Sequence, residues 1–246
     1  MDSIQILLIV SFFAIALIYA SVGFGGGSSY LALLAVTGVQ FDVIRPTALL
    51  CNIVVVTGGT YIFYKEGKLD LKKCWPFIAI SIPLSFIGGI WKLEQDTFFL
   101  LLGLCLILAS ILLWIQPGKV ENVKSGNIVF NSSIGGAIGL LSGLVGIGGG
   151  IFLSPILHLL KWDDAKRISA LASLFILVNS VSGLAGQITK IQDMRWPFIL
   201  PLAVAVLAGG QLGSRLGIHK FNQVHIKRVT SILILIAGIN ILKDHL

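Results

Sequence analysis

Two clusters of glycine are the residues of this sequence whose type and spacing best suit chemistry with a ligand. They read Gly-Phe-Gly-Gly-Gly over residues 23–27 and Gly-Ile-Gly-Gly-Gly over residues 146–150, 123 positions apart. Each cluster follows one apolar run and opens another, whereas a glycine inside a helix costs about 1 kcal/mol relative to alanine. The clusters therefore predict turns in which the backbone takes conformations closed to other residues and a ligand can approach the main chain.

A glycine turn that opens a helix presents free N–H groups and the positive end of the helix dipole, which together suit an anion. The alternative is that these glycines only let membrane helices pack closely. We favour binding because a whole element is duplicated, and we expect Gly103, in an ordinary span, to tolerate alanine far better. No Gly-Lys-Ser/Thr ending follows, so nucleotide loops are not expected. The candidate anion-binding glycines are Gly25, Gly26, Gly27, Gly148, Gly149 and Gly150.

Five polar side chains interrupt apolar runs, where such groups usually face the bundle interior and often only hydrogen-bond a neighbouring helix. Asn52 and Asn179 occupy similar places in the two copies, although not the same aligned position. This pair is predicted to face a central polar cavity and to contact substrate. The other three are Thr57, Ser182 and Gln187.

Arg45 and Arg167 lie 122 positions apart, and each precedes the same helix of its copy. An arginine can hold an oxyanion through two parallel hydrogen bonds. Each can equally pair with a nearby acid, Asp42 for Arg45 and Asp163 or Asp164 for Arg167, or with lipid headgroups. We favour pairing and keep both as candidate substrate-binding residues.

Several kinds of chemistry are not expected. No charged residue lies in the middle of an apolar run, which argues against a proton relay of buried carboxylates. Three cysteines and four histidines are scattered, so no metal or redox site is expected. No clustered acids, bases or nucleophiles suggest an enzyme. No cofactor is predicted, and no aromatic-basic strip suits nucleic acid.

The composition is that of a membrane protein. The 246 residues are 56% hydrophobic and 12% charged, with a mean hydropathy of +0.95. Several apolar runs are long enough to cross a bilayer, so the fold class is an all-α polytopic membrane protein. The net charge of +7 fits loops that orient the chain. The expected helices are 4–22, 27–39, 46–64, 75–91, 98–115, 128–145, 150–160, 168–188, one from Trp196, and 229–242.

The chain repeats itself. Trp75-Pro76-Phe77 matches Trp196-Pro197-Phe198, and Gly88-Gly89 matches Gly209-Gly210, both 121 positions apart. This predicts two homologous repeats of four to five helical segments, 1–116 and 127–246, joined by a linker at 117–126. Repeated halves are common in secondary transporters.

The distribution of Lys and Arg over the two sides of the membrane favours one arrangement of the two halves. If the glycine turns only kink the chain, nine of these residues fall on each side of the membrane; if the turns reverse it, thirteen fall on one side and five on the other. Because positive residues concentrate on the cytoplasmic side, we prefer inverted halves, with the 65–73 and 116–126 loops cytoplasmic and both termini outside. The segment 27–39 would span only about 20 Å of a core about 30 Å thick, so the glycine turns are predicted to lie inside the membrane.

The second cluster and the Ser154-Pro155-Ile156-Leu157 that follows it resemble the TauE/SafE family of bacterial membrane transporters. The first cluster departs from the family pattern, since Ala32 stands where the second has Pro155. The resemblance implies a secondary transporter in the bacterial cytoplasmic membrane that moves a small sulfur-containing anion, of the sulfite or organosulfonate type. An anion channel and a non-catalytic membrane subunit are the alternatives. The expected partners are a small anion, the bilayer and a coupling ion.

Overall fold

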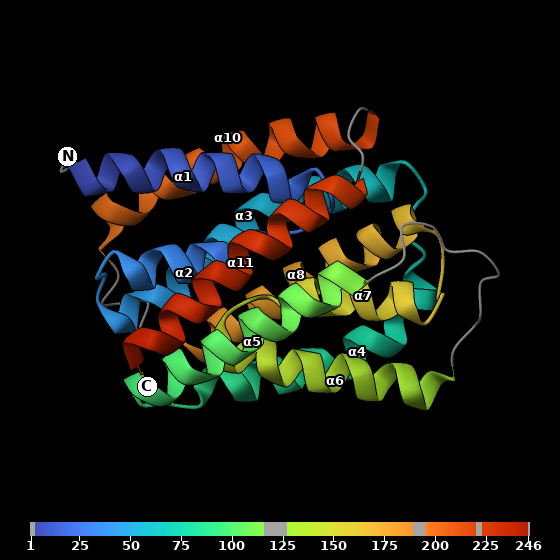
Figure 1. The fold of residues 1–246 in the computed structure, drawn as a ribbon. Helices are drawn as coiled ribbons and strands as arrows, with labels where there is room; N and C mark the ends of the chain where they lie inside the picture. The colour runs from blue at the N-terminus through green and yellow to red at the C-terminus, as the bar shows by residue number, and fades with distance from the viewer. Residues whose placement is uncertain (1–2, 116–126, 189–194, 220–222, 246) are drawn as a thin grey trace.

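The computed structural model describes residues 3–115, 127–188, 195–219 and 223–245, and this part of the chain is all-helical (Figure 1). The predicted linker, 117–126, and residues 189–194, between the expected helix 168–188 and the one from Trp196, lie outside it. The helices of the first half are α1 (Ser3–Ala20), α2 (Gly27–Val36), α3 (Phe41–Lys65), α4 (Leu71–Ile90) and α5 (Gln95–Ile115). Those of the second half are α6 (Ile128–Val145), α7 (Gly150–Leu159), α8 (Ala165–Gly186), α10 (Trp196–His219) and α11 (Gln223–His245).

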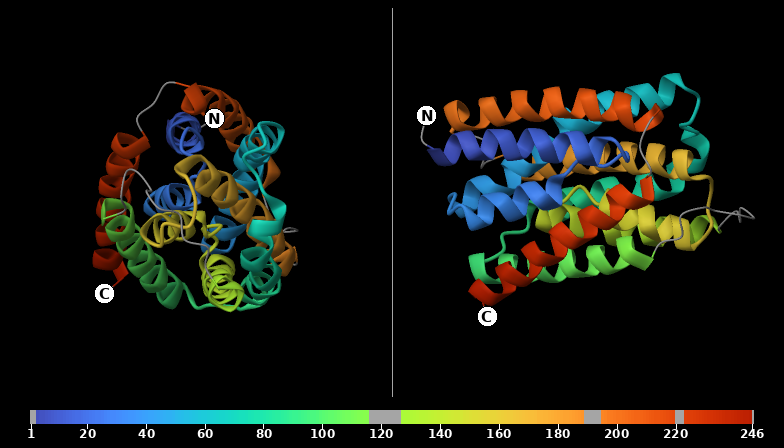
Figure 2. Two further views of the ribbon diagram at one scale, coloured as in Figure 1. Left: turned by 90° about the vertical axis from the view of Figure 1, so that its right-hand side faces the viewer. Right: turned by 45° about the horizontal axis from the view of Figure 1, so that its top comes forward.

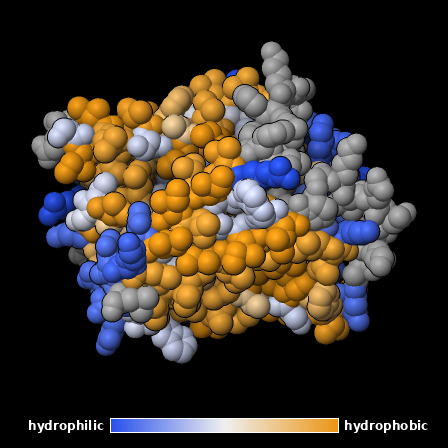
Figure 3. Space-filling model, in the orientation of Figure 1, coloured by the Kyte–Doolittle hydropathy of each residue, from blue (hydrophilic) through white to orange (hydrophobic). Residues whose placement is uncertain are grey.

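Seven of the described helices, namely α1, α3, α4, α5, α6, α8 and α10, are long and apolar enough to cross a membrane. Hydrophobic side chains cover the middle of the surface in Figure 3, and hydrophilic ones gather at its two ends. Many large apolar side chains are exposed, Leu7 and Val10 among them, as expected for a surface that faces lipid. The predicted fold class, an all-α polytopic membrane protein, is confirmed.

The chain reverses its direction at the first glycine turn. The ring of Phe12, in the middle of α1, stacks on that of Tyr30 in the first turn of α2, with 4.5 Å between ring centroids. If α2 continued along α1, the 18 positions between them would separate the two rings by about 27 Å. Figure 1 shows the same behaviour in the second half, where α7 runs back towards the end at which α6 begins.

Contacts at the two ends of the bundle agree with reversal at both turns. Lys73 Nζ lies 2.9 Å from Asp163 Oδ2, so the α3–α4 and α7–α8 loops share one end. Asp96 and His245 approach within 3.7 Å at the other end, where both termini lie in Figure 1. If the turns only kinked the chain, the two residues of each pair would lie on opposite sides of the membrane.

Helices of the two halves pack across each other in matching pairs. Helix α1 packs on α10 and α6 packs on α4, while α3 faces α8 and α5 faces α11. The counterparts in chain order are α1 and α6, α2 and α7, α3 and α8, α4 and α10, and α5 and α11. Exchanging each helix for its counterpart gives the same set of pairings. In the end-on view of Figure 2, the short helices α2 and α7 lie among the longer ones.

Glycines allow the close approach of α6 to α4 and of α5 to α11. A methyl group on Gly139 of α6 would lie 2.6 Å from the backbone of Ser81 in α4. A methyl group on Gly103 of α5 would lie 2.6 Å from Leu242 Cγ and 3.2 Å from Gly238 O in α11. Gly103 therefore lies at a close crossing of two helices, and its better tolerance of alanine relative to the glycine turns stays a prediction.

Several helices begin about one turn before the predicted apolar run. Asp70 caps α4, since its carboxylate accepts from the N–H groups of Lys72 and Lys73, and Asp164 caps α8 in the same way. The predicted helix start at residue 46 is wrong, because residues 42–45 form the first turns of α3, which starts at Phe41 and contains Pro46. Hydropathy does not detect a polar first turn, which a capping side chain stabilises.

Candidate functional site

The two glycine turns have matching backbone geometry at two positions, although Gly148 has a positive φ of 85° and its counterpart Gly25 does not. Gly26 and Gly149 cap α2 and α7 in the left-handed conformation, with φ of 88° and 81°. Gly23 and Gly146, three residues earlier in each turn, also have positive φ, 84° and 87°. Side chains strongly disfavour this region of backbone space, which explains why both turns require glycine where the chain reverses.

The two turns meet inside the bundle. A methyl group on Gly27 would lie 2.9 Å from the carbonyl oxygen of Ile147, in the other turn. The side chain of Asn52, from α3, lies between them and is fully buried. Its Nδ2 donates to Ile147 O at 3.1 Å, and its amide also borders Gly25, Gly27 and Gly148. Glycines from both halves thus surround one buried amide.

The N–H groups of these turns are exceptional because they are buried and have no acceptor. Residues 25–28 and 148–151 are all buried, and within the described residues none of their N–H groups donates a hydrogen bond. Buried backbone donors are nearly always paired. Eight such donors at two facing helix N-termini, each carrying the positive end of a helix dipole, form a region suited to negative charge.

Asn179 is buried as predicted but belongs to a different contact. Its Nδ2 donates to Phe175 O at 2.8 Å and to Ser81 Oγ of α4 at 3.1 Å, so its amide faces α4. The next residue of α8, Ser180, has its Oγ 3.0 Å from the position of a methyl group on Gly148. Sequence reasoning missed Ser180, because serines are common in membrane helices and nothing in its neighbourhood singles it out.

The structure does not bring the two arginines together. Arg45 is buried, with 4% of its surface exposed, and its guanidinium donates to the carbonyl oxygens of Gly143 at 2.8 Å, Gly88 at 3.2 Å and Trp91 at 3.4 Å. Arg167 lies at the opposite end, 3.5 Å from both Asp163 and Asp164. The pairing with nearby acids that we favoured describes Arg167, whereas Arg45 bonds to the ends of α4 and α6.

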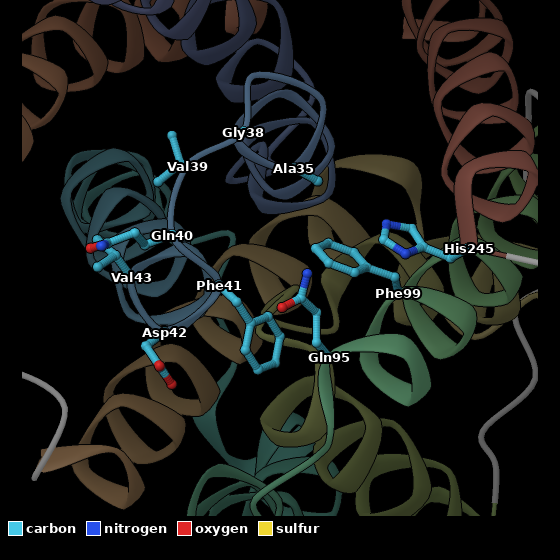
Figure 4. Close-up of a pocket in the computed structure, with 10 residues that line it drawn as sticks. All are labelled: Ala35, Gly38, Val39, Gln40, Phe41, Asp42, Val43, Gln95, Phe99 and His245. Atoms are coloured by element: carbon cyan, nitrogen blue, oxygen red, sulfur yellow. The ribbon is translucent and has the colours of Figure 1, made fainter.

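A pocket of about 640 Å³ opens at the end of the bundle that carries the termini (Figure 4). Its wall includes Gln40, Gln95 and His245, with the rings of Phe41 and Phe99. The buried ring of Phe98 packs edge-on against both rings, at 5.1 and 5.3 Å.

The same Phe98 ring connects this pocket to Arg45. The Arg45 guanidinium lies 5.9 Å from the Phe98 ring centroid. The Cα, Cβ and backbone oxygen of Arg45 would lie 3.5–3.6 Å from a methyl group placed on Gly146. Phe98 and Arg45 thus form a chain of contacts from the pocket wall to the second glycine turn.

Apolar spanning helices interrupted by facing half-helices are the architecture of a membrane transporter. The chain belongs to the family described as Sulfite exporter TauE/SafE, whose pattern it matches over residues 7–241. It is 32% identical to a probable membrane transporter protein of Sinorhizobium fredii, over 98% of this chain and 100% of that protein. It is 25% identical to a probable membrane transporter protein of Methanocaldococcus jannaschii, over 95% of this chain and 93% of that protein. No solved structure matches the chain.

Proposed function

We propose that this transporter is a secondary carrier for a small sulfur-containing oxyanion, of the sulfite or organosulfonate type, in the bacterial cytoplasmic membrane. The single observation that carries the proposal is the set of buried N–H groups without acceptors at the two glycine turns. An oxyanion between the turns can accept several of them at once. Backbone donors held in a low-dielectric interior replace part of an anion's hydration shell without any ionised side chain.

We also propose that the halves are inverted repeats and that they rock about the glycine turns. The exchange symmetry of the helix pairings supports this arrangement. The turns provide the site, the pocket beside Phe98 provides access from the end with the termini, and the ring of Phe98 with Arg45 closes that access. In such a carrier, substrate reaches each side of the membrane in turn.

The first test is transport by the purified full-length protein in liposomes. A carrier gives saturable counterflow, in which unlabelled sulfite inside the vesicles accelerates uptake of labelled sulfite, whereas a channel does not. Replacing Gly149 or Gly26 by alanine is expected to abolish this transport while the protein still folds. Each methyl group would lie 2.8–2.9 Å from neighbouring side chains, in a backbone conformation that alanine disfavours.

The matched control is Gly67→Ala. Gly67 has a similarly positive φ of 65°, but a methyl group there would have no neighbour within 4 Å. This variant carries the same backbone strain outside the site, so it should retain most of the transport rate. Normal transport by Gly149→Ala would show that the turns serve only helix packing, and Arg45 would then become the candidate anion-binding residue.

A further inference from the structure

The orientation of the Asn52 amide is fixed by its surroundings. Ile147 O is an acceptor, so the Asn52 atom that faces it at 3.1 Å must be the Nδ2 donor. The other end of the amide is then Oδ1, an acceptor. This Oδ1 is fully buried and has no hydrogen-bond partner. It lies against Gly25 and Gly27 of the first turn, among the N–H groups assigned above to the anion.

A second buried group of this site also has no partner. Ser180 Oγ makes no hydrogen bond. A methyl group placed on Gly148 would lie 3.0 Å from this Oγ and 2.9 Å from Asn52 Nδ2, so the two side chains border the same glycine. A hydroxyl can donate or accept, whereas Oδ1 can only accept. The site therefore combines many donors with one acceptor that requires a donor from its occupant.

A metal cation is the other class of occupant that an amide oxygen attracts. Here the oxygen lies beside the N-terminus of α2 and close to that of α7, and the positive ends of both helix dipoles disfavour a cation. An X–H group that belongs to an anion satisfies both requirements, because the anion's charge suits the dipoles and its proton suits Oδ1.

We propose that the glycine-turn site selects anions that carry their own hydrogen-bond donor. Its preferred substrate is then a protonated oxyanion such as hydrogen sulfite, ahead of the sulfite dianion and of sulfonates without a proton. This inference rests on the proposed function of the same site. Its physical basis is that a buried acceptor left unpaired by the wrong ligand costs binding free energy, as in sites that reject analogues lacking a hydroxyl.

The wild-type protein in liposomes provides the first test. Methanesulfonate has a tetrahedral head and a single negative charge but no proton to donate. We expect it to inhibit labelled sulfite counterflow with an inhibition constant at least about tenfold above that of hydrogen sulfite, which corresponds to about 1.4 kcal/mol. At constant total sulfite, uptake should fall as rising pH converts hydrogen sulfite into the dianion. The inhibition constant of methanesulfonate should not change, because this anion keeps its single charge.

Two variants test the assignment to Asn52. Asn52→Leu removes the acceptor, so hydrogen sulfite and methanesulfonate should then bind within about twofold of each other. Ser180→Ala removes a hydroxyl but keeps Oδ1, so it should weaken both anions by the same factor and preserve their ratio. The elution volume of each detergent-purified variant shows whether it is folded, and the wild-type comparison needs no variant.

The outcomes separate this inference from the proposed function. Saturable sulfite transport that methanesulfonate inhibits as strongly as hydrogen sulfite does would overturn the inference alone. A strict requirement for sodium or potassium, without any preference between the two anions, would overturn it in favour of a cation at Oδ1. A preference that persists in Asn52→Leu would remove Asn52 from the role. Absence of any saturable anion transport would overturn the proposed function and the inference together.

Discussion

Arg45 carries a buried positive charge that is stabilised by backbone carbonyls. Gly88 and Trp91 lie at the C-terminal end of α4, and Gly143 lies near that of α6. Carbonyls at a helix C-terminus have no partners within the helix and carry the negative end of its dipole. One guanidinium thus ties together helices of both halves beside the second glycine turn.

Replacing Arg45 by glutamine should therefore destabilise the protein far more than the same change at Arg167. It leaves buried carbonyls unpaired, at a cost of about 1–3 kcal/mol for each lost partner. The ion pairs of the half-exposed Arg167 contribute about 1 kcal/mol or less. Thermal unfolding of both variants in one detergent measures the difference, and equal melting temperatures would contradict this role of Arg45.

Single residues of the site were predictable to different degrees. The glycine turns could be identified because they are duplicated and because glycine has few other uses at the start of a helix. The burial of Asn52 and Asn179 follows from polarity in an apolar run. The face of α8 that meets the turns could not be predicted, because it depends on the rotation of α8 about its own axis. That rotation places Ser180 against Gly148 and directs Asn179 towards α4.

At the scale of elements, the crossing of α4 and α6 depends on glycines at every fourth position of α6. Gly139→Ala would place a methyl group 2.6 Å from the Ser81 backbone, whereas Gly136→Ala, one turn earlier, would meet only the side chains of Ile80 and Leu84, at 2.9 and 3.0 Å. We expect Gly139→Ala to cost about 1–3 kcal/mol through overpacking. Gly136→Ala should be much milder because these two side chains can move. Melting temperatures of the two variants test this, and a larger loss in Gly136→Ala would rule it out.

The ion pair between Lys73, in the first turn of α4, and Asp163, in the α7–α8 loop, gives a pH prediction. Burial alone would raise the pKa of Asp163, but hydrogen bonds from Lys73 and from the Asp164 N–H, with the charges of Lys73 and Arg167, lower that pKa below its ordinary value. The ionised form therefore stabilises the fold at neutral pH, and this contribution is lost as pH falls below about 4, the ordinary aspartate pKa, and through the lowered pKa.

Asp163→Asn tests this contribution. The variant should melt at a lower temperature than wild type at neutral pH, and the gap should narrow as the buffer is acidified. A gap that stays constant down to the lowest pH at which the protein remains soluble would show that the Asp163 carboxylate does not supply it.

Helix positions were predicted well from hydropathy, but helix starts were not. The start of α4 at Leu71 and that of α8 at Ala165 depend on the capping carboxylates of Asp70 and Asp164, which an apolar count treats as loop. The close contact at Gly103 also escaped prediction, because the partner of α5 is α11, in the other half of the chain.

For the whole molecule, the orientation in the membrane remains a prediction. The charge distribution places the end with the α3–α4 loop in the cytoplasm and the end with the termini outside. Both ends offer exposed acidic positions, Glu66 in the α3–α4 loop and Glu94 before α5. The natural cysteines, Cys51, Cys74 and Cys105, are buried.

Single-cysteine variants at these positions test the orientation in intact cells. A membrane-impermeant maleimide should label Glu94→Cys from outside, and Glu66→Cys only after the membrane is permeabilised. The reverse pattern would invert the proposed orientation, although it would leave the helix packing unchanged.

The cross-packing of the halves has a consequence for biosynthesis. The ribosome delivers α1 and α4 before their main partners α10 and α6, and α5 long before α11. Until the second half is inserted, the faces of α1, α4 and α5 that will meet those helices can be covered only by lipid or by helper proteins. Assembly of the bundle must therefore be largely post-insertional, and a nascent chain arrested after α5 would display the surfaces that membrane quality control recognises.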